Sequence, residues 1–346
     1  MNTDNPGKQE RRDFLQAAGA ASVTLALGGL PLASSAAGPA TTLRIEKVGL
    51  MSPGDMGQAL AIQIKAKGLT VYTALEHRSE RTRTLAREAG LIDLGTLSRL
   101  TVESDVVLSV LNPGAALDFA GEFAGALRAT GSHALFVDCN AIAPDTVRAI
   151  AAVIEGAGGR FIDAGIIGPP PRGSAKTNLF VSGPGAGVLE QLGGPQITVR
   201  VIGDRLSDAS ALKMCYGALT KGTQALWLNV LIAAQHLGVD GLLDEQLGQS
   251  QAALYDWALR QFPIMPPKAY RWVPEMLENV KTLESAGITA KMSQGTADVY
   301  RFVAATPLGK ETPENRDRAR DGREVVRLLA KASATTAGRS ANAQKQ

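Results

Sequence analysis

The stretch Gly49-Leu50-Met51-Ser52-Pro53-Gly54-Asp55-Met56-Gly57 decides how this chain folds. It follows a predicted strand over Thr42–Gly49 and precedes a predicted helix over Gln58–Lys67 that stops at Gly68. A second strand begins at Leu69. A strand, a glycine-rich turn, a helix and a strand within about 30 residues are the setting in which dinucleotide-binding folds place a pyrophosphate at a helix N-terminus.

The glycines of this turn have separate predicted roles. Gly49 allows a tight exit from the strand, Gly54 lets backbone amides approach a pyrophosphate, and Gly57 lets the helix pack close to the sheet. Gly49 and Gly54 are five positions apart, so we interpret the first turn as longer than in the usual G-x-G-x-x-G. An ordinary turn of an unrelated α/β protein is the alternative. The predicted cofactor-binding residues here are Gly49, Met51, Ser52, Pro53, Gly54, Asp55, Met56 and Gly57.

The segment after the second strand should choose between NAD and NADP. Glu76 is placed to accept hydrogen bonds from ribose hydroxyls, as NAD requires. Arg78 and Ser79 suit a 2′-phosphate, because a guanidinium and a hydroxyl together match its oxygens. The alternative is that Ser79 only caps the next helix. We expect NADP rather than NAD.

The strand pattern then repeats as far as residue 203. Further apolar strands are predicted over Asp105–Leu111, Ala134–Cys139, Gly159–Ala164, Asn178–Ser182 and Thr198–Ile202. Apolar strands separated by helices indicate an α/β fold, a Rossmann-like doubly wound parallel sheet followed by a smaller all-α domain. In such sheets the ligand lies beyond the carboxyl ends of the strands. This adds Leu111, Asn112 and Asn140 to the predicted cofactor-binding residues.

Strand patterns are absent from the sequence beyond Asp204, and helices are predicted over Ala211–Leu237, Leu242–Arg260, Tyr270–Ala286 and Thr289–Val303. The domain boundaries predicted are therefore 43–203 for an NAD(P)-binding Rossmann-like domain and 204–305 for an all-helical substrate and dimerisation domain. Residues 306–346 read as a charged and then disordered tail. The large apolar helices suggest a homodimer.

The first 37 residues read as an export signal. Arg11-Arg12-Asp13-Phe14-Leu15 is similar to a twin-arginine motif, and an uncharged stretch and small residues follow it. The sequence predicts export to the periplasm through the twin-arginine machinery and no stable membrane span after removal of 1–37. A membrane anchor or a cytoplasmic location is the alternative. The apolar run is short and rich in Gly and Ala for a span of about 20 residues.

Composition excludes several classes of protein. Lys and Arg total 36 against 33 Asp and Glu, a net charge of +3 with scattered basic residues, so we expect no nucleic-acid partner. Two cysteines and three widely separated histidines offer no metal-ligand spacing, so no metal site is expected. The predicted partner is a small-molecule substrate.

Several blocks in one order resemble the β-hydroxyacid dehydrogenases, the group containing 3-hydroxyisobutyrate and 6-phosphogluconate dehydrogenases. They are GLMSPGDMG, VDCNAIAP, FIDAGIIGPPPRGSAKTNLFVSG and SALKMCYGALTKG. The likeness is strongest to a branch of uncharacterised oxidoreductases with a SPGDMG turn and a segment similar to KAYRWVPEM, residues Lys268–Met276, and it spans about residues 43–305.

The resemblance implies that Lys213 is the general acid/base of an NAD(P)-dependent oxidoreductase acting on CH–OH. Two positions depart from the family pattern. Gly217 replaces an asparagine four residues after the lysine, and Ile167-Gly168-Pro169 replaces a serine followed by two glycines in the turn that binds the substrate carboxylate. Both departures weaken the inference that this protein acts on the substrates of the family, especially on a small 3-hydroxy acid. The predicted substrate-binding residues are Ile167, Gly168, Pro169, Gly217 and Lys221.

The chemistry of Lys213 can also be argued from the residues. Removing a hydride from a carbinol requires loss of the hydroxyl proton, and a lysine accepts it well only when burial or a like charge lowers its pKa. Lys221 lies two helical turns further on, where it could lower that pKa or bind an anionic substrate group. The alternative is that both lysines extend along a packed helix to solvent.

The expected function is hydride transfer between a nicotinamide and a small hydroxy or carbonyl compound. Because of Gly217 and Ile167, a nucleotide-binding protein without turnover stays open as an alternative. An imine reductase on the same fold, with a different proton donor, is the other.

Overall fold

A computed structural model describes residues 43–343, and for 335–343 the backbone alone. The export segment predicted over 1–37 lies outside these residues. Within the part of the chain that is described, no helix is long and apolar enough to span a membrane.

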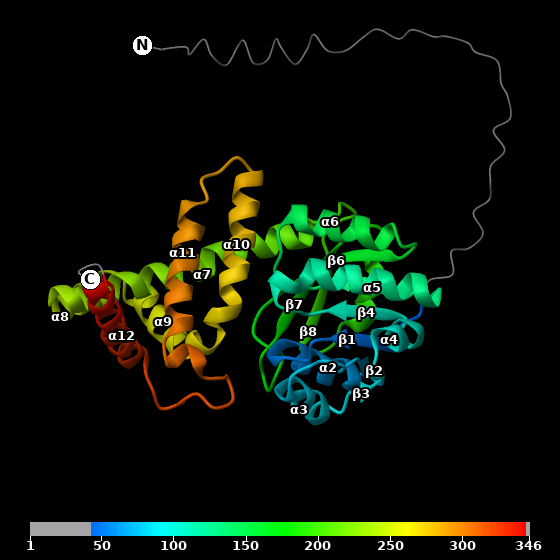
Figure 1. Ribbon diagram of the computed structural model, residues 1–346, viewed down its shortest axis with the longest axis horizontal. Coiled ribbons are helices and arrows are strands. Elements are labelled where there is room, and N and C mark those ends of the chain that lie inside the picture. Colours follow the sequence, from blue (N-terminus) through cyan, green and yellow to red (C-terminus); the bar gives the residue numbers. More distant parts are fainter. Residues whose placement is uncertain (1–42, 344–346) are drawn as a thin grey trace, which may run out of the picture. The chain divides into compact units, whose positions relative to one another are not determined.

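An eight-stranded sheet occupies the first half of the described chain, in the order β3-β2-β1-β4-β5-β6-β7-β8 (Figure 1). Its strands are β1 Lys47–Met51, β2 Thr70–Thr73, β3 Ile92–Asp93, β4 Val106–Ser109, β5 Leu135–Asp138, β6 Arg160–Ile167, β7 Thr177–Ser182 and β8 Ile197–Val201. Strands β1 to β6 are mutually parallel. Because the chain winds outward in both directions from β1, the doubly wound Rossmann-like fold is confirmed.

Helices cover both faces of the sheet because strand side chains alternate between the faces. Their bounds are α2 Asp55–Ala66, α3 Glu80–Glu88, α4 Leu97–Glu103, α5 Ala116–Thr130 and α6 Pro144–Glu155. Val48 and Leu50 of β1 belong to the core that α2 completes. Met51 faces the other core, which α4, α5 and α6 complete and which holds a group of phenylalanines that includes Phe123 of α5 and Phe136 of β5.

The last two strands reverse direction. Strand β7 pairs antiparallel with β6, and β8 is parallel to β7. The nine residues 168–176 that connect β6 to β7 are too few for a crossover helix, so the chain returns as a hairpin. The sheet is therefore mixed at this edge rather than parallel throughout.

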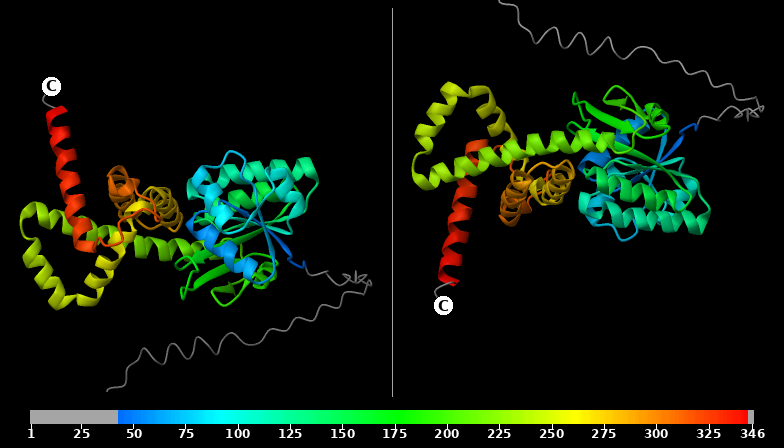
Figure 2. Two further views of the ribbon diagram at one scale, coloured as in Figure 1. Left: turned by 90° about the horizontal axis from the view of Figure 1, so that it is seen from below. Right: turned by 90° about the horizontal axis from the view of Figure 1, so that it is seen from above.

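The second half of the described chain is helical. Its helices are α7 Asp208–Leu237, α8 Asp240–Ser250, α9 Ala252–Gln261, α10 Ala269–Ser285, α11 Lys291–Ala305 and α12 Gly322–Ala343. Helix α7, 30 residues and thus about 45 Å long, runs from the sheet into this domain, where α10 and α11 lie side by side against it (Figure 2). A Cβ added to Gly165 of β6 would lie 2.7 Å from the Ala209 carbonyl oxygen, so α7 packs directly on the strand.

The prediction of a charged and then disordered tail over residues 306–346 is wrong for the part that the structure describes. Helix α12 buries Val325, Val326, Leu329 and Ala330 in the core of the helical domain. These residues recur at the spacing of one helix face. The sequence EVVRLLAKA carried this pattern, and the charged residues around it concealed it.

Candidate active site

Ser52, and not Gly49, makes the tight turn after β1. Ser52 has φ of 63°, in the left-handed region that glycine favours. Gly49 lies inside β1, and a Cβ there would lie 2.9 Å from Ser104 Oγ. The predicted role of Gly49 and the longer first turn are therefore wrong. The segment Ser52–Gly57 has the ordinary G-x-G-x-x-G spacing, with serine in the first position.

The rest of this turn fits a dinucleotide pyrophosphate. Gly54 caps α2 without a side chain, and the first heavy atom that a Cβ there would meet lies 4.0 Å away. The amides of the first helical turn thus remain open to an anion. A Cβ on Gly57 would lie 2.7 Å from the Ser52 carbonyl oxygen and 3.1 Å from Leu50 Cδ2 of β1, so the glycine allows α2 to pack close to the strand.

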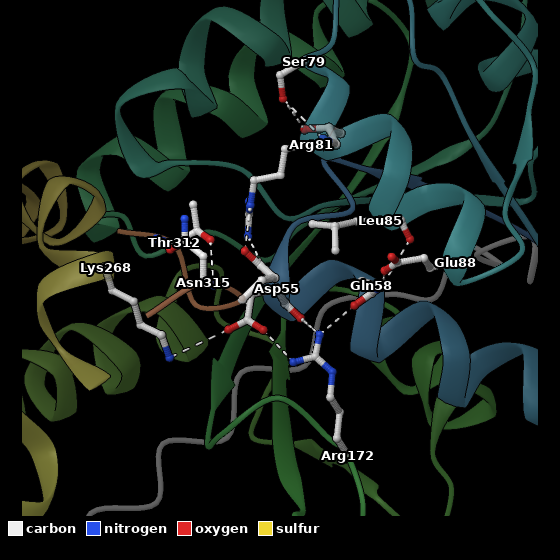
Figure 3. Close-up of polar contacts among 12 residues, drawn as sticks. Asp55, Gln58, Ser79, Arg81, Leu85, Glu88, Arg172, Lys268, Thr312 and Asn315 are labelled. Carbon is white, nitrogen blue, oxygen red and sulfur yellow. Dashed lines mark hydrogen bonds and ion pairs between the residues drawn. The ribbon is translucent and has the colours of Figure 1, made fainter. Parts of the chain in front are cut away.

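Cations surround Asp55 at the start of α2 (Figure 3). Arg172 Nη1 lies 2.5 Å from Asp55 Oδ1, and Arg172 Nη2 donates to Asp55 O and Gln58 Oε1, at 2.8 Å each. Lys268 Nζ lies 3.7 Å from Asp55 Oδ2. Burial lowers the pKa of Lys268, and Asp55 opposes that shift. These two cations offset a carboxylate that would otherwise repel a pyrophosphate.

A cavity of about 300 Å³ adjoins this cluster. Arg316 and Pro170 line it together with Asp55, Arg172 and Lys268. Sequence reasoning did not single out Arg172 or Lys268 as site residues. Their positions in the sequence could have indicated them, because Arg172 follows the predicted substrate-binding turn and Lys268 is the first residue of the KAYRWVPEM segment.

The nucleotide-selecting residues lie where the second strand ends. The Ser79 hydroxyl accepts from Thr82 N at 3.3 Å, so Ser79 caps α3, as the alternative anticipated. The guanidinium of Arg78 has no hydrogen-bond or ion-pair partner among the residues described, although its carbonyl accepts from Arg83 Nε at 3.2 Å. Glu76 is exposed and lies 3.6 Å from His77 Nε2.

Asn140 ties the ends of β4 and β5 together. Its Oδ1 accepts from Leu111 N at 2.5 Å, and its Nδ2 donates to Ser109 Oγ and Asp138 Oδ2. Asn140 is buried and both ends of its amide are engaged, so its side chain supports the strand ends instead of reaching outward. Asn112 likewise accepts from Gly114 N and caps a short 3-10 helix.

Lys213 reaches this same edge of the sheet. Its partly buried Nζ donates to the Cys139 carbonyl oxygen at 3.1 Å, directly after β5. Strand β5 is two strands away from β1, about 10 Å at the usual strand spacing. Burial lowers the pKa of Lys213, Glu275 opposes this shift, and Lys221 adds to it.

Lys221 does not present a free cation. Its Nζ lies 2.6 Å from Glu275 Oε1, and the two side chains are 19% and 10% exposed. Glu275 lies on α10 and was not identified from the sequence. Gly217 is buried beside the pair. Lys213, Gly217 and Lys221 are thus brought together, and the helical domain adds a carboxylate.

The turn predicted to bind the substrate follows β6. Ile167 is half-buried at the strand end, and Gly168 and Pro169 are exposed. Gly168 has φ of 138°, and a Cβ there would lie 2.9 Å from Thr177 Oγ1. The turn therefore requires this glycine, and residue 167 offers no hydroxyl.

Two buried carboxyls lie beneath the site, and sequence reasoning missed both. Burial raises the pKa of Asp138 to about 7, against two hydrogen bonds from Asn140 that lower it. Burial also raises the pKa of Asp163, whose oxygens accept from Ser210 and Ser182 and so anchor the start of α7. Among the described residues, no cluster of His, Cys, Asp and Glu could hold a metal.

Known proteins match both halves of the chain. Residues 47–192 match the NAD binding domain of 6-phosphogluconate dehydrogenase, and residues 234–303 match a domain of unknown function, DUF1932. An uncharacterised 28.5 kDa protein of Methanothermus fervidus is 31% identical over 201 residues, 58% of this chain and 74% of that protein.

Solved structures agree. A conserved protein of unknown function, reported as structurally similar to 3-hydroxyacid dehydrogenases, is 30% identical with a TM-score of 0.54, over 75% of this chain and 96% of that one. The 3-hydroxyisobutyrate dehydrogenase of Mycobacterium tuberculosis shares the fold, with 18% identity and a TM-score of 0.59 over 83% and 99% of the chains. With its nicotinamide dinucleotide-binding domain of the 6-phosphogluconate dehydrogenase type, the chain belongs to the 3-hydroxyacid dehydrogenase-like family, in an uncharacterised branch with a DUF1932 domain.

Proposed function

We propose that the protein is an NAD(P)-dependent oxidoreductase that transfers a hydride between nicotinamide and a small hydroxy or carbonyl substrate. One observation carries this proposal. The amine of Lys213 lies at the carboxyl edge of the sheet, on the Cys139 carbonyl oxygen, about two strands from the turn that fits a pyrophosphate.

Lys213 is the general acid/base in this proposal. A bound nicotinamide would accept or supply the hydride. The neutral amine of Lys213 takes the hydroxyl proton during oxidation, and its ammonium returns a proton during reduction. Burial lowers the pKa of Lys213 and so makes the neutral amine more accessible, while Glu275 keeps the ammonium available. The Cys139 carbonyl oxygen orients the amine.

NADP is the proposed cofactor in preference to NAD. The support is the guanidinium of Arg78, which has no partner among the described residues and follows the second strand. The hydroxyl of Ser79, already at the N-terminus of α3, adds a donor for a phosphate there. A 2′-phosphate would supply the negatively charged partner that the Arg78 guanidinium lacks among the described residues.

Titration of the chain with NADPH and NADH, followed by nicotinamide fluorescence, tests the proposal. Tight binding with a preference for NADPH is expected. Absence of binding for both dinucleotides would overturn the enzyme proposal. Replacement of Lys213 by alanine then separates chemistry from binding, since hydride transfer at an undiminished rate would remove Lys213 as the acid/base.

A nucleotide-binding protein without turnover is the second candidate. The observation that favours it is the loss of two substrate groups, with glycine at 217 and isoleucine at 167. Under this alternative the dinucleotide binds, and no hydroxy or carbonyl compound is turned over.

Dimerisation and export are also proposed. Helix α7 exposes Leu212, Tyr216, Leu219, Leu226, Val230 and Leu237. These side chains recur at intervals of three, four and seven residues, which is the pattern of a helix face that packs on a second chain. Light scattering of the purified protein tests for the homodimer. Fractionation of cells that make the full chain, with the Arg11-Arg12 pair intact or replaced by lysines, tests for twin-arginine export to the periplasm.

A further inference from the structure

Gly217 makes room for a carboxylate beside Lys213. A Cβ at position 217 would lie 3.1 Å from Glu275 Oε1 and 3.9 Å from Lys221 Nζ. The first of these distances is too short for comfortable packing, so a larger side chain would displace the ion pair. Glu275, from α10, thus occupies the space that a polar side chain from α7 would otherwise use.

The ion pair is held in place on several sides. Lys221 Nζ lies 5.3 Å from the centre of the Trp272 ring, and the Tyr300 hydroxyl donates to the Lys221 carbonyl oxygen at 2.8 Å. Asn279, also on α10, bonds Met214 O at 3.0 Å in the amide orientation that satisfies both of its ends. Helix α10 is therefore fixed against α7 at the level of Gly217.

One oxygen of Glu275 remains available. Oε1 accepts from Lys221, whereas no residue among those described donates to Oε2. The Glu275 side chain is 10% exposed, and a carboxylate oxygen at such a position gains from a hydrogen-bond donor. In the turn after β6, Ile167 supplies no hydroxyl to a substrate carboxylate. Positions 275 and 167 thus present an acceptor and no side-chain donor.

We propose that Glu275 determines substrate specificity. The substrate presents a hydrogen-bond donor, a hydroxyl or an ammonium group, to Glu275 Oε2, and it carries no carboxylate two carbons away from the reacting carbon. Because Oε2 can only accept a hydrogen bond, the carboxylate of a 3-hydroxy acid would find no donor there and would bind less tightly. This inference rests on the proposed function, because it assigns the substrate class of the same site.

The test measures binding to the full chain saturated with NADP. Calorimetry compares three probes of equal length: 1,3-propanediol, 3-amino-1-propanol and 3-hydroxypropanoate. We expect the diol and the amino alcohol to bind at least about tenfold more tightly than the acid, which is about 1.4 kcal/mol. In Glu275→Gln this preference should shrink about tenfold or more, whereas Glu284→Gln, at an exposed position of the same helix, should leave it unchanged.

The outcomes separate the two proposals. Tighter or equal binding of 3-hydroxypropanoate, binding of none of the probes, or a preference that Glu275→Gln leaves unchanged would each overturn the specificity proposal. A failure of NADP to bind the unaltered chain would instead overturn the proposed function. NADP affinity measured in Glu275→Gln shows whether the variant remains folded.

Discussion

The two sides of the site recognise their ligands by different means. On the sheet side, the pyrophosphate turn works through backbone amides, the left-handed Ser52 and the packing of Gly57 on β1. On the helical side, Lys213 and the Lys221–Glu275 pair work through side chains. Backbone recognition tolerates the replacement of glycine by serine at position 52, provided the left-handed conformation is kept. Side-chain recognition changes with a single residue, as Gly217 shows.

The largest expected effect comes from a substitution that removes a function of the helical side and leaves the sheet side intact. Lys213→Ala should lower kcat/KM for hydride transfer by about 100- to 10,000-fold, because it removes the acid/base. Binding of NADPH should be unchanged. The lowered pKa of Lys213 also predicts that kcat/KM for oxidation rises with pH to a plateau whose midpoint lies below 10.5. Stopped-flow absorbance of the nicotinamide measures both quantities, with Lys213→Arg as the charge-retaining control.

The second effect concerns the buried carboxyl of Asp138, at the end of β5. Because burial raises the pKa of Asp138 from 3.8 to about 7, the folded state holds a proton that the unfolded chain has lost between those pH values. The free energy of unfolding should therefore fall as pH rises from about 4 to about 7, by up to about 1.4 kcal/mol per pH unit. Urea unfolding at several pH values measures this slope.

Asp138→Asn should flatten that slope, although it also weakens one of the two bonds from Asn140. Asp145→Asn, at an exposed and ion-paired aspartate of α6, is the comparison variant. An equal slope in Asp138→Asn and the unaltered chain would show that Asp138 does not carry the proton.

A pair of glycine variants sharpens the account of the sheet side. Gly57→Ala places a Cβ 2.7 Å from the Ser52 carbonyl oxygen and should destabilise the fold by about 1–3 kcal/mol. Gly54→Ala meets no such contact, so it should leave the unfolding midpoint almost unchanged while weakening NADPH binding. Thermal unfolding and fluorescence titration of both variants give the comparison. Equal destabilisation of the two would refute the separate roles.

The smallest expected effect concerns the choice of nucleotide. Arg78→Ala should weaken NADPH binding by about tenfold, since a hydrogen bond from the partly exposed Arg78 to a charged group should contribute at the lower end of about 1.5–3 kcal/mol. NADH binding should stay within twofold, as measured by the same titration. Arg99→Ala, in α4, serves as a control for loss of one positive charge. Equal losses for the two dinucleotides would assign Arg78 to another part of the cofactor.

Much of the sheet side could be predicted from the sequence, because its signals are local. Strand, turn and helix follow one another within residues 47–66, and the backbone they form is the binding element. The left-handed conformation of Ser52 was missed because residues other than glycine rarely adopt a positive φ. Strand β7 was expected to be parallel, and only the short connection 168–176 argues against that.

The helical side was harder to predict because its contacts join distant residues. Lys221 and Glu275 are 54 positions apart, and no periodicity of α7 or α10 indicates that they meet. Lys213 was identified from a motif and a resemblance, and α7 brings its amine to the Cys139 carbonyl oxygen at the sheet edge. The docking of α12 depended on four apolar residues within a charged segment.

Glu278 joins the two domains by an unusual means. Its Oε2 accepts from Ala143 N at 2.8 Å and from Thr146 Oγ1 at 2.7 Å, so a side chain of α10 caps the N-terminus of α6. A hinge motion that separated α10 from α6 would leave both donors uncapped and a nearly buried carboxylate without these partners. A rearrangement that separates α10 from α6 therefore breaks these two hydrogen bonds, whereas one in which α6 and α10 move as one body keeps both.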